Sequence, residues 1–473
     1  MRSLYEKIVA FILSVLAFFG LFRPSAAEPP ATEPDVQITT HHHMSVDISS
    51  KGVIERAYCT DENCTESVEV GITLPMKHTL RGSFDCSDEN YRMIDNSTVF
   101  VYNTTDFDGY MDEMKNLGCE LVRTYSLGNN RYALMKHPYF TVYVSLLCAE
   151  GQLRVNIGRS DELAPPQMTG AASGETAPKL WQLSIDNEAA KQNGGMGYIL
   201  QLSDGSYIIV DGGYETDADA EAIFDVLTQN NPSDCEKPVI AAWFITHQHS
   251  DHYGAFYRFT RNYKDAVEVK AFYCNLPYRD FDDIHPQNCK NLEGVMASWP
   301  GAVLYRKLHS GMRFRICNAD VAVICTFEDI YPFDLSDGND TSLVFQVSLG
   351  GQRILFTGDA EYGESDRMKY LDASVLQSDF LQYPHHGFDK QCKEDFYEKV
   401  NPAVVLWPMP FVNHITSGTV FDWRYETRAE NAWVKNAECV KKIVVNDEGM
   451  TCFDLPYTPE GERICDYASL TGT

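Results

Sequence analysis

The chain has 473 residues, of which 44% are hydrophobic and 12% aromatic, so it can bury a large core and is expected to form two globular domains. Its formal net charge of −28 at pH 7 is dispersed along the sequence rather than gathered in one tail. A surface this negative repels polyanions, which argues against tight nonspecific binding to long nucleic acid or to an anionic membrane. A small charged substrate held by metal ions remains compatible with it.

The first 27 residues have the pattern of a secretory signal peptide. Arg2 and Lys7 give a charged start, residues 8–22 are apolar, and small residues at 25–27 suit a cleavage site. The apolar run is short for a membrane-spanning helix, so cleavage is favoured over an uncleaved anchor, although Arg23 fits an anchor. We expect a secreted or extracytoplasmic protein with no membrane span after cleavage, or an anchored one if the leader is kept.

Export would permit disulfide bonds, and the chain has 14 cysteines. Cys59 and Cys64 flank a polar turn and are candidates for a local pair. Cys148, Cys317 and Cys325 lie in apolar, strand-like runs and are candidates for buried thiols. The connectivity as a whole cannot be read from the sequence.

A small α+β domain is predicted for residues 45–160, after a flexible tether at residues 28–44 that is rich in Pro, Thr and Ala. The patterns indicate a strand at 97–102, a helix at 106–117, and three strands that begin near residues 120, 132 and 140. This segment contains no catalytic cluster. We therefore expect it to present substrate or to bind a surface.

A linker rich in Pro and Gly is predicted at residues 161–177, and a larger domain at residues 178–473. Strand and helix signals alternate through this domain, which implies a layered α/β fold with helices covering the sheets. An amphipathic helix at 221–229 precedes a buried strand at 239–246. That strand leads directly into the densest group of metal-binding residue types in the chain.

This group is the run His247-Gln248-His249-Ser250-Asp251-His252. Imidazole and carboxylate groups are the ligands of zinc and similar divalent ions, and three protein ligands with an open position define a catalytic site. Solvated loop histidines are the alternative explanation. The density of ligands at the end of a strand favours a metal site.

Further acidic and imidazole residues follow other strong strand signals, namely Asp211, Asp340, Asp359 and the pair His385-His386. Taken singly, each fits an ordinary turn or loop. Taken together, they place polar groups on one rim of a sheet, where α/β enzymes build their sites.

This ordered set of motifs resembles the metallo-β-lactamase fold superfamily, whose pattern is an early Asp, H-x-H-x-D-H, a later Asp and a final His, each at a strand end. The resemblance covers about residues 178–456 and implies an α/β fold of the αββα sandwich type. Residues 339–345, residues 355–359 and His385-His386-Gly387 look more narrowly like the extracellular hydrolase domain of bacterial competence-type DNA-uptake proteins.

The resemblance implies two metal ions that share one carboxylate. His247 and His249 would bind the first ion, Asp251 and His252 the second, and Asp359 would bridge them. Zinc is the expected metal from the ligand types, with manganese or iron as alternatives where carboxylates replace imidazoles.

His385 or His386 would complete the second site. We favour His385, because it comes first after the strand and leaves His386 to act at the substrate. Asp211 would orient a metal-bound imidazole. Related proteins in which the first ion has its full set of ligands have a further histidine where this chain has Asn339 or Asp340. The set of ligands for the first ion is therefore incomplete in this chain.

Two ions about 3.5–4 Å apart lower the pKa of a bridging water and stabilise charge on the attacked group, so hydrolysis by a metal-bound hydroxide needs no protein nucleophile. Asp251 could orient that hydroxide or take its proton, and His386 or His414 could protonate a leaving group. His285 and His309 are alternative ligands, although ordinary structural roles are favoured for both.

The sequence therefore predicts a secreted metal-dependent hydrolase that acts on a phosphodiester or related phosphoester. The acidity favours a small-molecule or cell-envelope substrate over long DNA. Hydrolysis of an amide, lactone or thioester is the alternative within enzymes. A noncatalytic binding protein that keeps a relic metal site is the alternative outside them, and the sequence does not indicate the oligomeric state.

Overall fold

The computed structural model describes residues 44–49, 51–59, 64–75, 80–85, 98–166, 176–185, 195–232, 235–277, 285–330, 335, 337–388, 392–408, 429–446 and 449–460. The chain from His42 onward forms one compact unit. The predicted signal peptide, all of the predicted tether except its last residue, and His414 lie outside the described residues. Within these residues, no helix is long and apolar enough to cross a bilayer.

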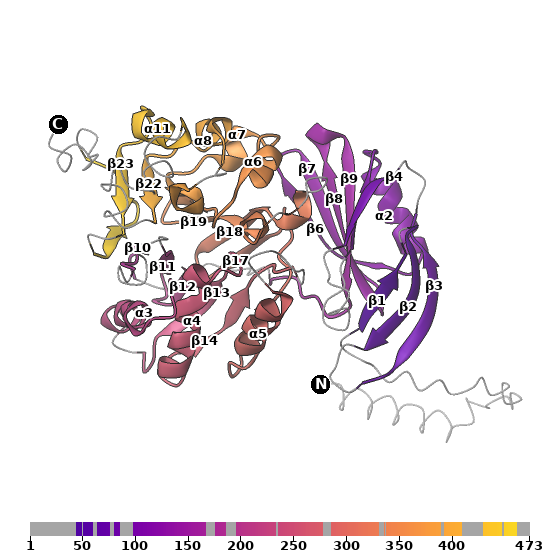
Figure 1. Cartoon of the computed structure of the whole chain (residues 1–473), viewed down its shortest axis with the longest axis horizontal. Coiled ribbons are helices and arrows are strands. Elements are labelled where there is room, and N and C mark those ends of the chain that lie inside the picture. The colour runs from indigo at the N-terminus through magenta and orange to yellow at the C-terminus, as the bar shows by residue number, and fades with distance from the viewer. Residues whose placement is uncertain are drawn as a thin grey trace, which may run out of the picture. The chain divides into compact units, whose positions relative to one another are not determined.

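Two large β-sheets form the centre of the part that follows the predicted linker (Figure 1). In spatial order, the eight-stranded sheet contains β16 (Val303–Tyr305), β15 (Ala271–Tyr273), β13 (Val239–Phe244), β12 (Tyr207–Asp211), β11 (Gly197–Gln201), β10 (Lys179–Gln182) and β24 (Thr451–Asp454), with β14 (Glu268–Val269) paired to β13. The seven-stranded sheet contains β17 (Arg313–Ile316), β18 (Ala319–Cys325), β19 (Val344–Leu349), β20 (Gln352–Phe356), β21 (Phe380–Gln382), β22 (Val404–Trp407) and β23 (Lys442–Val445).

Helices cover the outer faces of both sheets. The helices of the first sheet are α3 (Asp217–Gln229), α4 (Ser250–Tyr263) and α5 (Pro286–Ala297), and those of the second are α6 (Tyr362–Met368), α7 (Ala373–Leu376), α8 (Glu394–Val400) and α11 (Ala429–Asn436). These layers confirm the predicted αββα fold class, and the two sheets with their helices are called the sandwich below.

The alternation of side chains along β12 explains why this strand is apolar throughout. Ile208 and Val210 belong to the hydrophobic cluster shared with the second sheet, whereas Tyr207 and Ile209 belong to the cluster shared with α3 and α4. Successive residues of a strand point to opposite faces, so a strand with both faces covered needs an uninterrupted apolar run. Polar residues then appear only where the strand ends.

The register of the sheets brings several strand ends to one edge. β12 and β13 are parallel, and so are β20, β21 and β22. The segments that leave the carboxyl ends of parallel strands meet at the same edge of a sheet, which is where sites form in α/β folds. Asp211 ends β12, and the histidine run follows β13.

Two antiparallel sheets precede the sandwich. The three-stranded sheet contains β1 (Met44–Ile48), β2 (Val53–Cys59) and β3 (Ser67–Thr73). The six-stranded sheet contains, in spatial order, β4 (Leu80–Asp85), β5 (Thr98–Tyr102), β9 (Gln152–Arg159), β8 (Phe140–Leu147), β7 (Asn130–Lys136) and β6 (Glu120–Leu127), and it packs against α2 (Phe107–Asn116). The Asp106 side chain caps α2 by accepting a hydrogen bond from the Gly109 N–H. A small domain with one helix was predicted here, and its boundaries stay predictions.

The structure does not join Cys59 and Cys64 in the expected disulfide. Cys317 and Cys325 are buried, as the apolar runs around them indicated, whereas Cys148 is exposed. Cys148 follows β8 at the start of the 3-10 helix η2 (Cys148–Glu150), where the strand has already left the core.

The six-stranded sheet contacts the sandwich through a buried polar group around His309. The Tyr143 hydroxyl of β8 donates to the Ser310 carbonyl over 2.8 Å, and the His309 ring stacks on Tyr143 with centroids 4.3 Å apart. His309 Nδ1 lies 2.5 Å from Glu328 Oε2, and its Nε2 lies 3.6 Å from Glu162 Oε2. Burial would lower the pKa of His309, but the two carboxylates outweigh it and raise that pKa to about 9. His309 is thus a structural histidine.

Replacing His309 by glutamine should lower the free energy of unfolding by about 3–5 kcal/mol near pH 6, because two buried carboxylates lose their cation. The folded pKa of about 9 lies above the unfolded value of about 6.5. The stabilisation is therefore fully present below about pH 6.5 and is lost as the pH rises through about 9. Urea titrations of wild type and His309→Gln at about pH 6 and about pH 9 measure this difference.

The matched control is Asp320→Asn, which removes an exposed pair with Arg315 and should cost less than about 1 kcal/mol at either pH. A difference between wild type and His309→Gln that is the same at both pH values would contradict the assignment.

Candidate metal centre

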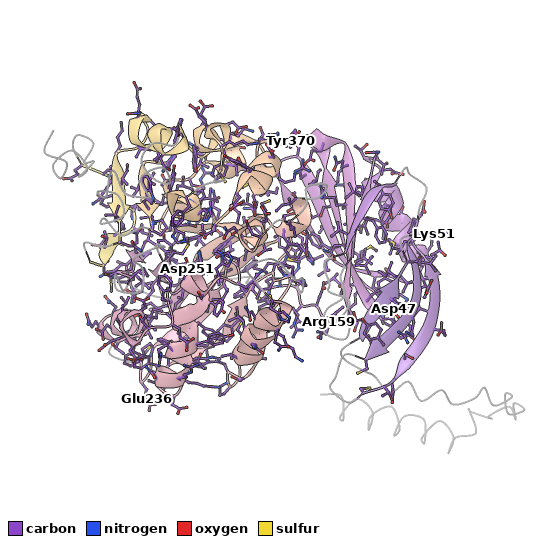
Figure 2. All side chains as sticks on the ribbon, viewed as in Figure 1. Asp47, Lys51, Arg159, Glu236, Asp251 and Tyr370 are labelled. Carbon is purple, nitrogen blue, oxygen red and sulfur yellow. The ribbon has the colours of Figure 1, made fainter. Side chains whose placement is uncertain are left out.

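The candidate ligands come from the ends of β13 and β20, the start of α4, and the loop after β21. β13 ends at Phe244, and His249 is the residue before the first turn of α4. The histidine run therefore spans a strand end and a helix start, with Asp251 in the first turn of α4, where the helix dipole favours a negative charge. Asp251 is labelled in Figure 2, near the middle of the sandwich.

Four ligand atoms converge at one point. His252 Nε2 lies 3.3 Å from His386 Nε2, and Asp359 Oδ2 lies 3.2 Å from the first and 3.3 Å from the second. Asp251 Oδ2 lies 3.5 Å from His386 Nε2. Tetrahedral zinc with bonds of about 2.0–2.1 Å separates its ligand atoms by about 3.3 Å. The spacing of these atoms therefore fits one tetrahedral ion.

A second group of ligand atoms meets the first at Asp359. His247 Nε2 lies 3.0 Å from His249 Nδ1 and 3.8 Å from Asp359 Oδ2. The Asp359 side chain is buried, and its Oδ1 has no hydrogen-bond partner among the described residues. Buried carboxylate oxygens are normally paired, so a carboxylate with one orphaned oxygen, whose other oxygen lies near imidazoles of both groups, fits a shared metal ligand. The donor set as a whole suits divalent ions.

Hydrogen bonds behind the histidines fix the direction in which their free nitrogens point. His252 Nδ1 lies 2.9 Å from Asp211 Oδ2, and the N–H and hydroxyl of Thr246 also donate to Asp211. His386 Nδ1 lies 2.7 Å from the Pro408 carbonyl. Each ring therefore holds its proton on Nδ1, which leaves Nε2 directed into the cluster.

The backbone around Asp359 is held by a buried amide. Gln382 Oε1 accepts hydrogen bonds from the N–H groups of Thr357 and Gly358, each over 2.7 Å. The Asp359 N–H donates to Ser342 Oγ over 2.9 Å. Gly358 has φ +54°, and a Cβ there would lie 2.9 Å from the Thr246 Cβ, so glycine is required for this close approach.

The loop that carries His386 is strained. His385 and His386 have φ values of 45° and 51°, in the left-handed region, followed by Gly387 at 79°. Two successive non-glycine residues in this region cost energy that the surroundings must supply, and such strain concentrates at functional sites. The turn directs the two histidines to different places.

The carboxylates of the cluster control its protonation. Burial would lower the pKa of His252, but Asp359, Asp251 and Asp211 outweigh it and hold that pKa well above the usual value. Burial would raise the pKa of Asp359, but His252 and His386 outweigh it and hold it well below the usual value. The cluster therefore attracts positive charge, and a divalent ion would displace the protons.

His385, which the sequence favoured as a ligand, lies outside the cluster. Its Nδ1 is 3.3 Å from Glu361 Oε1, and its Nε2 is 3.2 Å from Asn339 Nδ2. Asp340 belongs to the same neighbourhood, because its carboxylate lies near that of Glu361. The structure thus places His386 with the other candidate ligands and His385 with Asn339 and Asp340. The ligand role itself stays a prediction for each residue.

The remaining sequence candidates lie elsewhere. His285 is exposed and caps α5, and His309 is part of the interface described above. Sequence reasoning missed Thr246 and Gln382, although each had a signal: Thr246 directly precedes the histidine run, and Gln382 is a polar residue in an apolar strand. The carbonyl of Pro408 had none.

Residues 193–283 match the family model of the metallo-β-lactamase superfamily, a segment that holds Asp211 and the run His247–His252. Comparison with curated protein sequences gives no match. This match and the αββα layers support the resemblance to that superfamily. The narrower resemblance to competence-type hydrolases stays a prediction.

Solved structures with a similar fold include three proteins. The metallo-β-lactamase fold protein YhfI from Bacillus subtilis is 12% identical, with a TM-score of 0.37 over 59% of this chain and 100% of its own. A diphosphatase of the PhnP family is 12% identical, with a TM-score of 0.31 over 58% and 97%. A long-form RNase Z from yeast is 9% identical, with a TM-score of 0.36 over 64% of this chain and 44% of its own.

Adjacent histidines provide a test of the ligand geometry. His386→Ala should weaken zinc binding at least about 100-fold, since it removes a nitrogen 3.3–3.5 Å from three other candidate ligand atoms. His385→Ala serves as the matched control and should retain wild-type zinc content after dialysis. Metal analysis and chelator competition measure both. If His385→Ala lost zinc and His386→Ala kept it, His385 rather than His386 would be the ligand.

Asp211→Asn should weaken zinc binding by about 10–100-fold, because an amide cannot accept all three hydrogen bonds that the carboxylate takes from Thr246 and His252. Asp204→Asn is the control, since Asp204 lies in the turn between β11 and β12 and its carboxylate accepts hydrogen bonds from the N–H and hydroxyl of Ser206. Equal affinity in Asp211→Asn and wild type would show that Asp211 does not orient a ligand.

Proposed function

We propose that the chain is a metal-dependent hydrolase that acts on a phosphodiester or related phosphoester. The observation that carries this proposal is the arrangement of two ligand groups around one buried carboxylate. Asp359 Oδ2 lies within 3.2–3.8 Å of imidazole nitrogens from both groups, and its other oxygen is unpaired. A shared carboxylate is the arrangement that two neighbouring hydrolytic metal ions need.

The proposed ligands of the more complete site are Asp251, His252, His386 and Asp359. Two imidazoles with two carboxylates suit zinc, which is the metal that we propose. His386 replaces His385 in this set because its Nε2 points at the other ligand atoms.

The other proposed site has His247, His249 and the shared Asp359. His252, whose ligand atom lies within 4.8 Å of those of His247 and Asp359, is assigned to the other site, and Asn339 donates to Glu361. With fewer protein ligands, this site would bind its ion more weakly, and manganese or iron are candidates beside zinc.

When bound, the ions would acidify a coordinated water and stabilise charge on the attacked phosphoryl group. The protein supplies orientation and proton handling. The Asp251 side chain is 13% exposed, whereas those of Asp359 and His386 are 3% and 1% exposed. Asp251 is therefore the carboxylate that we propose to orient the attacking water or take its proton.

His386 is no longer assigned as the proton donor to a leaving group, because both of its ring nitrogens are engaged. His414 lies outside the described residues and stays a prediction for that role.

The competence-type resemblance favours phosphodiester chemistry, and the net charge of −28 favours a small or cell-envelope substrate over long DNA. We propose export as the setting, on the basis of the signal-peptide pattern at the start of the chain.

A noncatalytic binding protein is the second candidate, and the missing third ligand of the His247 and His249 group favours it. The strain in the His385-His386 turn and the shell of hydrogen bonds behind His252 argue for a working site.

The test is hydrolysis of bis(p-nitrophenyl) phosphate by chain loaded with zinc, manganese or iron, beside a panel of lactones and one β-lactam. We expect phosphodiester turnover that a chelator abolishes and added metal restores. Asp359→Ala should lose at least about 1,000-fold in kcat/KM together with bound metal, since both sites lose their shared ligand.

The control is Asp366→Asn on α6, whose carboxylate bonds to surface lysines, and it should keep wild-type activity. Turnover of the lactones or the β-lactam without turnover of the phosphodiester would contradict phosphodiester hydrolysis and favour acyl hydrolysis. Bound metal without turnover of any of these substrates would favour the binding protein.

A further inference from the structure

Beside the metal centre, and using none of its proposed ligands, a second set of side chains brings hard oxygen ligands together. Asp337, Asp340 and Glu361 place carboxylate oxygens within 4.8 Å of one another. Asp340 and Glu361 are buried, and Asp337 is partly exposed. Asp340 lies in the 3-10 helix η4 (Asn339–Thr341) before β19, whereas Glu361 caps α6. Two separate segments therefore meet at these carboxylates.

Asn339 adds an unpaired oxygen to this set. Its side chain is 8% exposed, and its Nδ2 donates to Glu361 Oε1 over 3.1 Å, so the carboxamide is held against the cluster. Its Oδ1 is buried and has no hydrogen-bond partner. A buried carbonyl oxygen normally has a partner, and a cation held by the neighbouring carboxylates would supply one.

The charge of the cluster also favours a cation. Three carboxylates at this spacing repel one another, and His385, with Nδ1 3.3 Å from Glu361 Oε1, offsets one charge when protonated. Glu364 is fully buried beside them, and its Oε1 has no hydrogen-bond partner. Burial and then the charge of Asp340 raise the pKa of Glu364 well above its usual value. Burial first, and the nearby Asp340 second, thus favour the neutral form of Glu364.

We infer that Asp337, Asp340 and Glu361, with Oδ1 of Asn339, form a binding site for a hard divalent cation of the calcium and magnesium class. Such ions prefer carboxylate and amide oxygens, whereas zinc prefers the imidazole-rich centre nearby. Oxygens that ligate one calcium ion at about 2.4 Å lie at most about 4.8 Å apart, and the three carboxylates stay within that limit. The partly exposed Asp337 provides the entrance and room for water ligands.

A bound cation would fasten η4 to the start of α6. This contact lies next to the strained turn at His385, which already bonds to both Asn339 and Glu361. The inference is independent of the proposed hydrolase activity, because it concerns different ligands and a different class of ion.

The test is calorimetric titration of the full chain, with and without prior zinc loading, with calcium, magnesium and manganese chloride in separate experiments. We expect one equivalent of at least one ion with a Kd below about 1 mM, and a rise in Tm in its presence. Asp337→Asn and Glu361→Gln should each weaken this binding at least about tenfold. Asp366→Asn, an acidic residue of the same helix α6 that bonds to Lys369 and Lys393, should titrate as wild type does.

No binding of any of the three ions by the wild type up to about 10 mM would overturn the inference, and so would unchanged binding in both variants. If Glu361→Gln does not fold, Asp337→Asn decides, because Asp337 lies at the partly exposed edge. His386→Ala should keep this binding while it loses zinc. Loss of both together would overturn the separation of the two sites.

Discussion

The burial of the Asp359 carboxylate is the interaction on which the rest of the site depends. A carboxylate that is nearly inaccessible to water is costly unless positive charge and donors compensate for it. Here His252 and His386 lie 3.2 and 3.3 Å from Asp359 Oδ2, and His247 lies 3.8 Å away. The cost of burying this one group explains why imidazoles from three segments of the chain converge on it, and why a divalent cation would stabilise it further.

The sandwich provides the rigidity that this convergence requires. Asp359 follows β20, and its backbone is fixed by Gln382 from the neighbouring strand β21. On the other sheet, Asp211 at the end of β12 bonds to Thr246 just beyond β13. Each sheet thus locks its own part of the site by a hydrogen bond between adjacent parallel strands. The ligand geometry follows from the sheet register, because the loops themselves are too short to set it.

The fold and the metal cluster could be predicted because their signals are local. The apolar run of β12 and the density of ligands from His247 to His252 need no knowledge of distant residues. The choice between His385 and His386 could not be made in this way, because it depends on a left-handed turn that sends neighbouring side chains in different directions. The role of His309 depends on Glu162 from the segment after β9, which is distant in the sequence, so no local pattern reveals it.

Strands β1 to β3 were also missed, and the reason is physical. The adjacent charged residues Glu55 and Arg56 interrupt the apolar run of β2, and β3 is mostly exposed, so neither strand shows a clear alternation of apolar and polar residues. Pairing with a neighbour, rather than burial of both faces, defines such strands. Periodicity alone detects them poorly, because a half-exposed strand of seven residues offers only a few apolar positions.

The lack of a histidine at positions 339 and 340 and the presence of the acidic cluster around Glu361 have one structural cause. The segment before β19 carries Asn339 and Asp340, and both turn toward Glu361 rather than toward His247. An imidazole in place of Asn339 would give up the hydrogen bond to Glu361 and would leave that buried carboxylate less well compensated. On the two proposals above, the His247 and His249 group would be the weaker imidazole site, and the carboxylates around Glu361 would lie next to it. Because the two sets of ligands differ in hardness, they would select different ions, and one metal would not need to compete with the other for the protein.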